Sequence, residues 1–429
     1  MRTTKQHRRA VGVLLCGVWC ALIGPGCAPS PGAAPLPRIC ARDGRFVEKR
    51  TGRTFHVRGF NYEHYKPPPM GYLGTFSPKR YCPNSAEMML ADLAEHGFTI
   101  VRVFIDPTSS HGEGIVASWD ADGLSPAYIA NFCDFLSRAR RHRIYVLVTL
   151  DGLPDCKRYA AIKGKAPPGI EGVNRIFLHR GHIDAYALHI ADFARAIRAR
   201  DATLLSTVFA FQLWNEASYR AAAPFSKTSG TITPANGKTY DLSSRDDLQR
   251  MADDHAVLWA NACADAVRQV DPDAMVTVGM FTFGAVGRAG PGQVRPSDAK
   301  DKRIPLRPLA LTRSKLSFLD IHFYPFGPRT LDRDLRNIEF DKLKVACRKR
   351  GMPLVMGEFG AFKSAFATIP EAIDGMVRHV RRVMELGFSG YIYWTYDSHS
   401  QHWLWNAKSG RGEIFEALAK LHGGGVSRR

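Results

Sequence analysis

Two glutamates stand where a buried strand has no structural use for a charge. Glu216 ends the apolar run 211–216 (Phe-Gln-Leu-Trp-Asn-Glu), and Glu358 lies in 355–360 (Val-Met-Gly-Glu-Phe-Gly). Both runs are typical of parallel strands buried on both faces. A buried, unpaired carboxylate costs roughly several kcal/mol. Two of them facing one cavity are the groups needed to cleave a glycosidic bond, one as acid and base and the other as nucleophile.

The elements that would position these glutamates repeat a strand–loop–helix pattern. Apolar runs predict eight strands, at residues 57–62, 99–105, 144–150, 208–214, 275–279, 318–323, 354–357 and 390–394. Helical spacing between them predicts helices over 85–96, 183–200, 248–270, 335–350, 369–386 and 413–421, and one that Ser125 and Pro126 open. The glycine-rich phosphate turn of an open doubly wound sheet is missing after the first strand. The sequence therefore predicts an α/β fold, a single (β/α)8 TIM barrel, preceded by a small hairpin at 45–57.

The loops that follow the strands are long, and those that precede them are short. The long ones cover 106–124, 151–182, 217–247 and 281–317. Long loops on the C-terminal face are how such a barrel builds a cleft. Within the third loop, the segment 231–240 with its Asn236-Gly237 turn predicts a hairpin beside Glu216, forming a wall of the cleft.

Other residues that could do chemistry lie at or near strand ends. Arg102 is a charge inside an apolar strand and could hold a carboxylate ionised. Asn215 could donate to a sugar hydroxyl. His322 and Tyr324 alternate, so both can face the same side. Trp394 offers a flat platform for a sugar ring. Each alone is compatible with a core position, and each glutamate alone with a structural salt bridge, but their concentration at strand ends indicates a functional site in which these five residues bind substrate.

This set resembles glycoside hydrolase family 5, the cellulase and β-mannanase group of retaining (β/α)8 glycosidases, over essentially the whole mature chain. The motifs that carry the resemblance are Arg58-Gly59-Phe60-Asn61-Tyr62, Val101-Arg102, Trp214-Asn215-Glu216, His322-Phe323-Tyr324, Gly357-Glu358-Phe359-Gly360 and Trp394. The resemblance implies that Glu216 is the acid/base and Glu358 the nucleophile. One position departs: where many members carry a histidine after strand three, this chain has Asp151, which could take over a hydroxyl contact.

The paired glutamates lead to a specific expectation about mechanism. Double displacement with retention needs the two carboxyl groups about 5–5.5 Å apart. The charge of Glu358 would raise the pKa of Glu216, and Arg102 would keep Glu358 ionised. No metal or organic cofactor is required. The expected substrate is a β-linked polysaccharide or oligosaccharide, with β-mannan or β-glucan first.

Two other functions stay open at this stage. A transglycosylase would use the same residues and pass the glycosyl unit to a sugar, with Trp403 and Trp405 as acceptor-side platforms. A non-catalytic carbohydrate-binding protein of the cell envelope could have kept the barrel and lost turnover.

The N-terminus predicts export. Residues 1–27 have the layout of a secretory leader, with basic residues before the uncharged run 10–23. Cys27 directly follows Gly26, which raises the alternative of a lipidated cysteine and membrane attachment. Residues 28–39 form a proline-rich tether, and residues 40–429 the catalytic domain. The expected location is secreted, periplasmic or tethered to the envelope.

The net charge bears on whether the chain binds nucleic acid, and the cysteines bear on disulfides and zinc sites. The net charge is +19, and the leader carries four of the basic residues and no acids, which leaves +15. These charges are scattered over helices and not interleaved with aromatic residues, so a nucleic-acid partner is not expected.

Cys82 and Cys156, in loops on one face, are the best disulfide candidates, whereas Cys133, Cys263 and Cys347 are expected to be buried free thiols. No cysteine spacing suggests a zinc site, and nothing indicates an oligomeric state.

Overall fold

The computed structural model describes residues 33–63, 74–108, 112–326 and 330–421. A compact unit begins at Pro35. The predicted leader and Cys27 lie outside the described residues. Among the described helices, none is long and apolar enough to cross a membrane.

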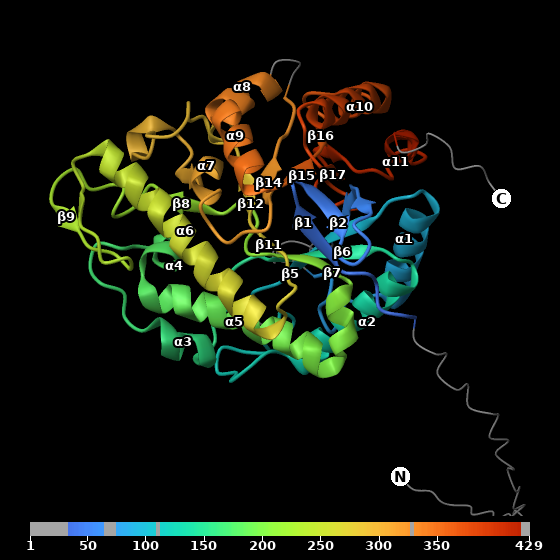
Figure 1. The fold of residues 1–429 in the computed structure, drawn as a ribbon, viewed down its shortest axis with the longest axis horizontal. Helices are drawn as coiled ribbons and strands as arrows, with labels where there is room; N and C mark the ends of the chain where they lie inside the picture. Colours follow the sequence, from blue (N-terminus) through green and yellow to red (C-terminus); the bar gives the residue numbers. More distant parts are fainter. Residues whose placement is uncertain (1–32, 64–73, 109–111, 327–329, 422–429) are drawn as a thin grey trace, which may run out of the picture. The chain divides into compact units, whose positions relative to one another are not determined.

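A parallel sheet forms the centre of the compact unit, and helices surround it (Figure 1). Its strands are β4 (Val57–Asn61), β5 (Ile100–Ile105), β6 (Tyr145–Leu150), β7 (Val208–Gln212), β11 (Val276–Thr277), β12 (Gly279–Phe281), β14 (Leu319–His322), β15 (Leu354–Phe359) and β17 (Gly390–Tyr393). Their order in the sheet is β11-β7-β6-β5-β4-β17-β15-β14-β12. All eight predicted strands are thus confirmed, the fifth of them split into β11 and β12.

The split strand closes the sheet. β11 pairs with β7 at one end of the sheet, and β12 pairs with β14 at the other. Only Val278 separates β11 from β12, so a single extended segment joins the two ends of the sheet. The fold is therefore a (β/α)8 TIM barrel, as the sequence predicts.

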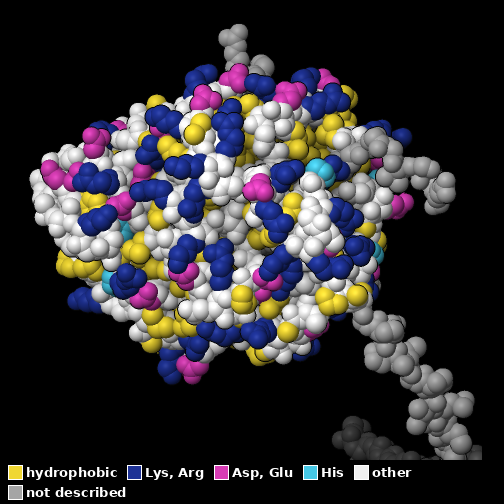
Figure 2. Space-filling model, viewed as in Figure 1, with side chains coloured by type: hydrophobic (Ala, Val, Ile, Leu, Met, Phe, Trp, Pro, Cys, Tyr) yellow, Lys and Arg dark blue, Asp and Glu magenta, His cyan; other side chains and the backbone are white. Residues whose placement is uncertain are grey.

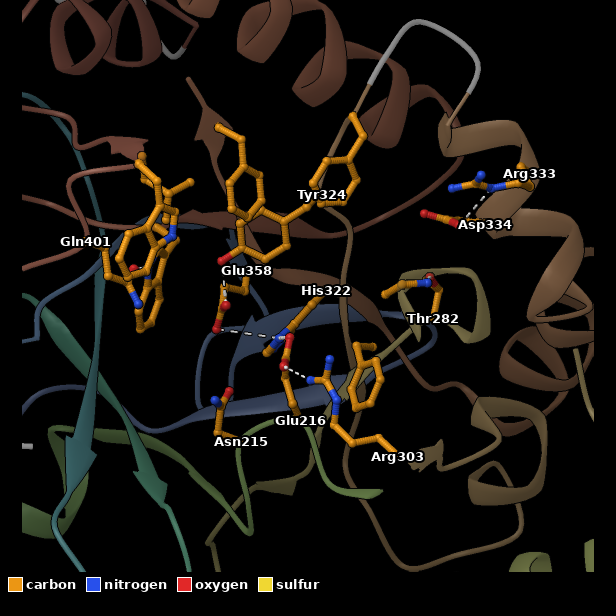
Figure 3. A pocket seen from close by; sticks show the side chains of 17 residues that line it. Asn215, Glu216, Thr282, Arg303, His322, Tyr324, Arg333, Asp334, Glu358 and Gln401 are labelled. Carbon is orange, nitrogen blue, oxygen red and sulfur yellow. Dashed lines mark hydrogen bonds and ion pairs between the residues drawn. The ribbon is translucent and has the colours of Figure 1, made fainter. Parts of the chain in front are cut away.

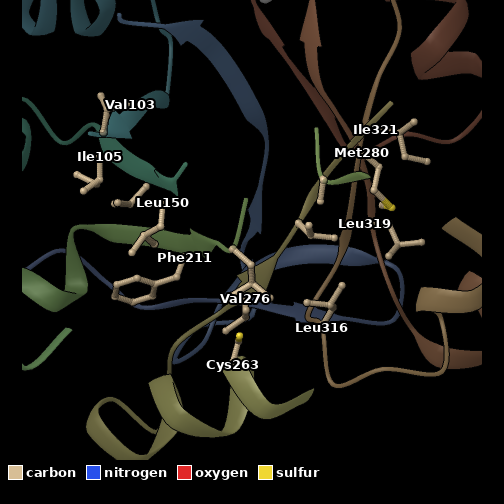
Figure 4. Close-up of a cluster of buried hydrophobic side chains, with 14 of the residues drawn as sticks. Val103, Ile105, Leu150, Phe211, Cys263, Val276, Met280, Leu316, Leu319 and Ile321 are labelled. Carbon is tan, nitrogen blue, oxygen red and sulfur yellow. The ribbon is translucent and has the colours of Figure 1, made fainter. Parts of the chain in front are cut away.

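Side chains along each strand alternate between the interior of the barrel and the layer under the helices, and the inward apolar ones fill the N-terminal part of the interior. Ile100 of β5 belongs to an interior apolar cluster with residues from the other strands, whereas Val101 and Val103 belong to the layer between strands and helices. Figure 4 shows this outer layer, with strand residues such as Val276 packed against Cys263 of the helix α6 (Arg245–Val270). Because side chains alternate, Arg102 shares the interior face with Ile100 and lies nearer the C-terminal end of the strand.

A small antiparallel sheet covers the N-terminal end of the barrel. It consists of β1 (Ile39–Arg42), β2 (Arg45–Glu48) and β3 (Thr54–Phe55), in the order β1-β2-β3. The predicted hairpin at 45–57 is therefore present, with β1 added to it. Phe46 of β2 is fully buried in the interior cluster, and Leu36 and Ile39, from the predicted tether, are buried in the same cluster.

The helices begin and end close to the predicted positions. The main ones besides α6 are α1 (Pro83–Glu95), α2 (Pro126–Arg141), α5 (Arg180–Arg200), α9 (Phe340–Arg350), α10 (Ile369–Glu385) and α11 (Glu413–Lys420). Thr368 and Glu371 form the predicted capping box. The single helix predicted over 335–350 is wrong: α8 (Thr330–Asn337) and α9 are separate, because Glu339 between them has a left-handed backbone with φ 56°.

The loops after the strands carry short elements of their own. These are α3 (Lys157–Lys163), α4 (Asn174–Leu178), β8 (Ser218–Arg220), β9 (Thr231–Ile232), β10 (Tyr240–Asp241), β13 (Arg303–Pro305), α7 (Pro308–Leu311), β16 (Ala361–Phe362) and β18 (Leu404–Trp405). The predicted hairpin forms as β9 and β10, but it packs on α6, where the backbone N–H of Asn236 donates to His255 Nε2 at 3.3 Å. Its predicted place as a wall of the cleft is wrong. Arg303 of β13, which pairs with β8, lines the cavity instead.

The predicted disulfide is absent. Cys40, Cys82, Cys133, Cys156, Cys263 and Cys347 are all free. Cys82 is exposed at the N-cap of α1, within hydrogen-bond distance of Ser85, whereas Cys156 is buried in the core at the N-cap of α3. Cys133, Cys263 and Cys347 are buried free thiols, as expected.

Candidate active site

A cavity of about 290 Å³ opens over the C-terminal ends of the strands, and both glutamates line it. Figure 3 shows Glu216, His322 and Glu358 side by side at its floor. Six of the predicted site residues line the cavity, namely Asn215, Glu216, His322, Tyr324, Glu358 and Trp394. The structure therefore brings together residues that the chain spreads over 180 positions. Arg102 and Asp151 are not among the lining residues.

Glu358 accepts hydrogen bonds from two sides. Its side chain is almost fully buried at the C-terminal end of β15. Arg102 Nη1 donates to Oε2 at 2.8 Å, and the Tyr324 hydroxyl donates to Oε1 at 2.5 Å. Charge-assisted hydrogen bonds of this kind favour the ionised form. These two hydrogen bonds fix the position of the Glu358 carboxyl group at the cavity.

Arg102 acts from beneath the cavity. It is fully buried inside the barrel, and its other N–H groups donate to side-chain oxygens of Asn61, Gln212 and Asn215. The predicted role in holding a carboxylate fits this position. The predicted contact with substrate does not, because no part of Arg102 lines the cavity.

The glycine before Glu358 permits a close approach between two strands. A Cβ at position 357 would lie 1.8 Å from Asp320 Oδ1, so only glycine fits there. Asp320 is fully buried in β14 and accepts a hydrogen bond from Gln212, which itself accepts from Arg102. Gly357 thus lets β14 and β15 enclose the polar network that fixes Arg102.

Glu216 follows β7 and is strained. Its backbone is left-handed, with φ 47°, a conformation that costs a non-glycine residue of order 1–3 kcal/mol. Its side chain keeps 26% of its surface exposed and reaches His322 Nδ1 at 3.2 Å through Oε1 and Arg303 Nη1 at 3.6 Å through Oε2. The strained backbone aims the carboxyl group into the cavity.

The electrostatic surroundings of Glu216 differ from those expected. Burial raises the pKa of Glu216, and the charges of Arg303 and Arg102 oppose this rise, while Asp301 adds to it. The expected direction is confirmed. The expected cause is corrected, because desolvation, and not the charge of Glu358, is the main contribution.

His322 lies between the two glutamates. Its Nδ1 is 3.2 Å from Glu216 Oε1 and 3.5 Å from Glu358 Oε2. Burial lowers the pKa of His322, which favours a neutral ring with a single N–H. Nδ1 lies within reach of both glutamate carboxyl groups, whereas Nε2 faces Asp320 Oδ1 at 3.8 Å.

One oxygen of each glutamate and a ring nitrogen of His322 all lie within 4.8 Å of one another. This is the one group of described residues whose spacing could suit a metal ion. However, Arg102 and Arg303 already place positive charge against the same two carboxylates, which disfavours a divalent cation. The spacing suits instead two carboxyl groups that act on the same bond.

The other predicted residues take different positions. Asn215 Oδ1 accepts from Arg102 Nη2 at 2.8 Å, which leaves its amide N–H groups as donors toward the cavity. Trp394 is 4% exposed and lines the cavity, and its indole N–H donates to Gln401. Asp151 is half-buried behind Asn215, whose backbone hydrogen-bonds to it, and burial raises the pKa of Asp151 to about 6. Its predicted substrate contact is not supported by this position.

The cavity also has walls that the sequence did not reveal. They include Phe281, Thr282, Arg303, Phe326, Arg333, Asp334, Phe362 and Gln401. Most lie in β12, β13, α8 and β16, at positions that no sequence pattern marked. Trp403 lines the cavity, whereas Trp405 is not among the lining residues and its indole donates to the Phe366 carbonyl at 2.8 Å.

Comparisons with known proteins bear on this site. The family model for cellulases of glycosyl hydrolase family 5 matches residues 185–400. A search of curated proteins found no match.

Several solved structures share the fold. An endo-1,4-β-mannanase from Rhizomucor miehei is similar with a TM-score of 0.58 and 13% identity, over 89% of this chain and 99% of that one. An endo-β-1,4-mannanase from Thermotoga petrophila has a TM-score of 0.53 and 16% identity, over 88% and 79%. An endocellulase from Pyrococcus horikoshii has a TM-score of 0.51 and 16% identity, over 91% and 100%.

Proposed function

This chain belongs to glycosyl hydrolase family 5 and is an O-glycosyl hydrolase, and from that premise we propose that it cleaves a β-linked glycan by double displacement with retention of anomeric configuration. The nucleophile is Glu358 and the acid/base is Glu216. β-Mannan and β-glucan are the first substrates to consider.

The observation that carries this proposal is the pairing of two carboxyl groups in opposite electrostatic settings. Arg102 and Tyr324 donate to Glu358 and stabilise its charge. Burial raises the pKa of Glu216 and favours its protonated form. One member is thus prepared as a nucleophile and the other as an acid.

The steps follow from these roles. A Glu358 oxygen attacks the anomeric carbon, and the bond to the leaving oxygen breaks as Glu216 gives that oxygen its proton. In the second step Glu216, now a carboxylate, takes a proton from water. The water oxygen then displaces Glu358 from the anomeric carbon, which releases the sugar and restores both side chains. Oxygens of the two glutamates lie within 4.8 Å of each other, and this proximity supports a route in which both carboxyl groups act on the same bond.

The proposed substrate class rests on the walls of the cavity and on the neighbours. Trp394, Phe326, Phe362 and Trp403 give the cavity aromatic faces on which sugar rings can stack. Two of the similar structures are named as β-mannanases and one as an endocellulase. For this chain we therefore propose a β-linked hexose polymer or oligomer.

A panel of β-linked polysaccharides with product analysis tests this proposal. We expect one or more to be hydrolysed by the wild type, and Glu216→Ala and Glu358→Ala to lose at least about a thousandfold in kcat. Azide should restore turnover of an activated aryl glycoside in Glu216→Ala, because a small anion can replace the base-activated water. Glu416→Ala, at an exposed glutamate of α11, is the matched control. Full activity in Glu358→Ala, or none in the wild type on any glycan, would overturn the proposal.

Transglycosylation is a second candidate, favoured by one observation. The Trp403 side chain is 47% exposed at the rim of the cavity, where an acceptor sugar could stack in place of water. Products longer than the starting oligosaccharide, lost in Trp403→Ala, would support it. Hydrolysis products alone at high substrate concentration would exclude it.

We also propose that the chain is exported and that Cys27 is a candidate for lipidation. The support is the sequence of residues 1–27. Labelling with a fatty-acid analogue, compared between wild type and Cys27→Ala, distinguishes an anchored protein from a secreted or periplasmic one.

A further inference from the structure

The two oxygens of Glu216 have different neighbours. Oε1 lies 3.2 Å from His322 Nδ1, whereas Oε2 lies 3.6 Å from Arg303 Nη1 (Figure 3). The other charged or titratable groups around Glu216 are Arg102 on β5, Asp151 after β6, Asp301 before β13, Tyr324 after β14 and Glu358 on β15. Arg102 lies beneath the cavity and Arg303 within its wall. Arg303 is therefore the cation that lies closest to Oε2 of Glu216.

Arg303 is fixed from behind. Asp301 accepts from its Nε at 3.1 Å and from its Nη2 at 2.8 Å. The guanidinium carbon lies 4.9 Å from the ring centroid of Phe281, in a cation–π contact. Its backbone carbonyl accepts from the buried Arg288, and β13 is paired with β8. A side chain fixed by these two contacts, on a backbone that is itself held in place, can stabilise a charge without first reorganising.

Resting on the proposed role of Glu216, we propose that Arg303 is the positioning residue that stabilises the Glu216 carboxylate between the two steps of the reaction. In the first step the Glu216 proton leaves with the departing oxygen, and the new negative charge forms against Arg303. In the second step a proton from water neutralises the carboxylate again. No atom of Arg303 forms or breaks a bond.

If Arg303 stabilises the Glu216 carboxylate, its removal must shift the pH dependence of activity in one direction. Burial favours the protonated acid, and Arg303 favours the carboxylate, so the two set the pH above which the acid form is lost. Asp301 faces the same guanidinium with the opposite charge. Removing Arg303 should therefore move the alkaline limb of the pH profile up, and removing the charge of Asp301 should move it down.

The pH dependence of kcat/KM tests this in the full chain, on whichever glycan the wild type hydrolyses. In Arg303→Gln the alkaline limb should move to higher pH by about one unit, the lower end of the effect of a neighbouring opposite charge. Arg303→Lys keeps the charge and should recover most of that shift. Arg333→Gln removes a second cation of the same cavity, which pairs with Asp334 and not with Glu216, and should leave the limb in place.

Asp301→Asn should shift the alkaline limb in the opposite direction, so it still tests the role of Arg303 if Arg303→Gln does not fold. Its alkaline limb should move to lower pH, because Arg303 then acts on Glu216 without the counter-charge. The inference is overturned if the wild type hydrolyses the glycan and Arg303→Gln leaves the limb unmoved, if Arg333→Gln shifts it equally, or if Asp301→Asn moves it upward. Absence of hydrolysis by the wild type overturns the proposed function instead.

Discussion

At the scale of single residues, the site depends on a buried cation. Arg102 is fully buried, and its N–H groups donate to Glu358, Asn61, Gln212 and Asn215. The sequence already marked Arg102, because a charge inside an apolar strand is rare. It could not show that the guanidinium lies under the cavity, since that follows from which face of β5 turns inward.

Arg102→Met should both destabilise the fold and abolish turnover. It leaves the Glu358 carboxylate buried without its cation, and breaking a buried pair costs about 3–5 kcal/mol. Chemical denaturation with an unchanged m value measures this loss. Arg378→Met is the control, because Arg378 and Asp374 form an exposed pair, expected to contribute less than about 1 kcal/mol. Equal losses in the two variants would contradict the account of Arg102.

Tyr324→Phe should lower activity with little effect on the fold. It removes one charge-assisted hydrogen bond to Glu358, worth about 1.5–3 kcal/mol, and so about ten- to a hundredfold in kcat/KM. Tyr393→Phe removes a hydroxyl that donates instead to the Trp405 carbonyl, and should keep near-normal kinetics. If Tyr324→Phe has wild-type kcat/KM, its hydroxyl has no part in preparing Glu358.

At the scale of elements, sequence pattern located the strands well and the cavity walls poorly. The eight strands were found because they are continuous apolar runs, and Glu216 and Glu358 because they interrupt such runs. The break between α8 and α9 was missed, since nothing in the helical spacing of 335–350 requires Glu339 to adopt a left-handed backbone. Arg303 was missed for a related reason: it reaches the site through the pairing of β13 with β8, a long-range contact that local pattern does not encode.

Gly357→Ala tests the close approach of β14 and β15. The added methyl would lie 1.8 Å from Asp320 Oδ1, so the strands must separate, at a cost of about 3 kcal/mol or more. Gly123→Ala is the matched control: no heavy atom lies within 4 Å of the place that its added methyl would occupy, and its effect should stay within about 0.5 kcal/mol. Wild-type thermal stability in Gly357→Ala would contradict this prediction, because it would show that β14 and β15 can separate at no cost.

At the scale of the whole molecule, one end of the barrel is apolar and the other is charged. The interior cluster around Phe46 fills the N-terminal end, and the network of Arg102, Asp320 and the two glutamates occupies the C-terminal end. Lys and Arg side chains are spread over the surface together with Asp and Glu, as Figure 2 shows for one face. Stability therefore comes mainly from the apolar layers, and the charged end is the part most sensitive to pH.

Asp151→Asn should change the pH dependence of global stability. Burial raises the pKa of Asp151 to about 6, above its ordinary value near 3.9. The native state thus binds this proton more tightly than the unfolded chain, so its contribution to stability is full below about pH 4 and is lost as pH rises to about 6. The variant should match the wild type near pH 4 and exceed it at pH 8, by at most about 3 kcal/mol. Equal stability at both pH values would contradict the raised pKa.

The stereochemistry of the first-formed product distinguishes double displacement through Glu358 from direct attack by water. Proton NMR, recorded during hydrolysis of a β-linked oligosaccharide and before mutarotation, distinguishes the two anomers of the newly released reducing end. If Glu358 forms a covalent intermediate and Glu216 activates water, the β anomer must appear first. Initial appearance of the α anomer would contradict the assignment of Glu358 as nucleophile.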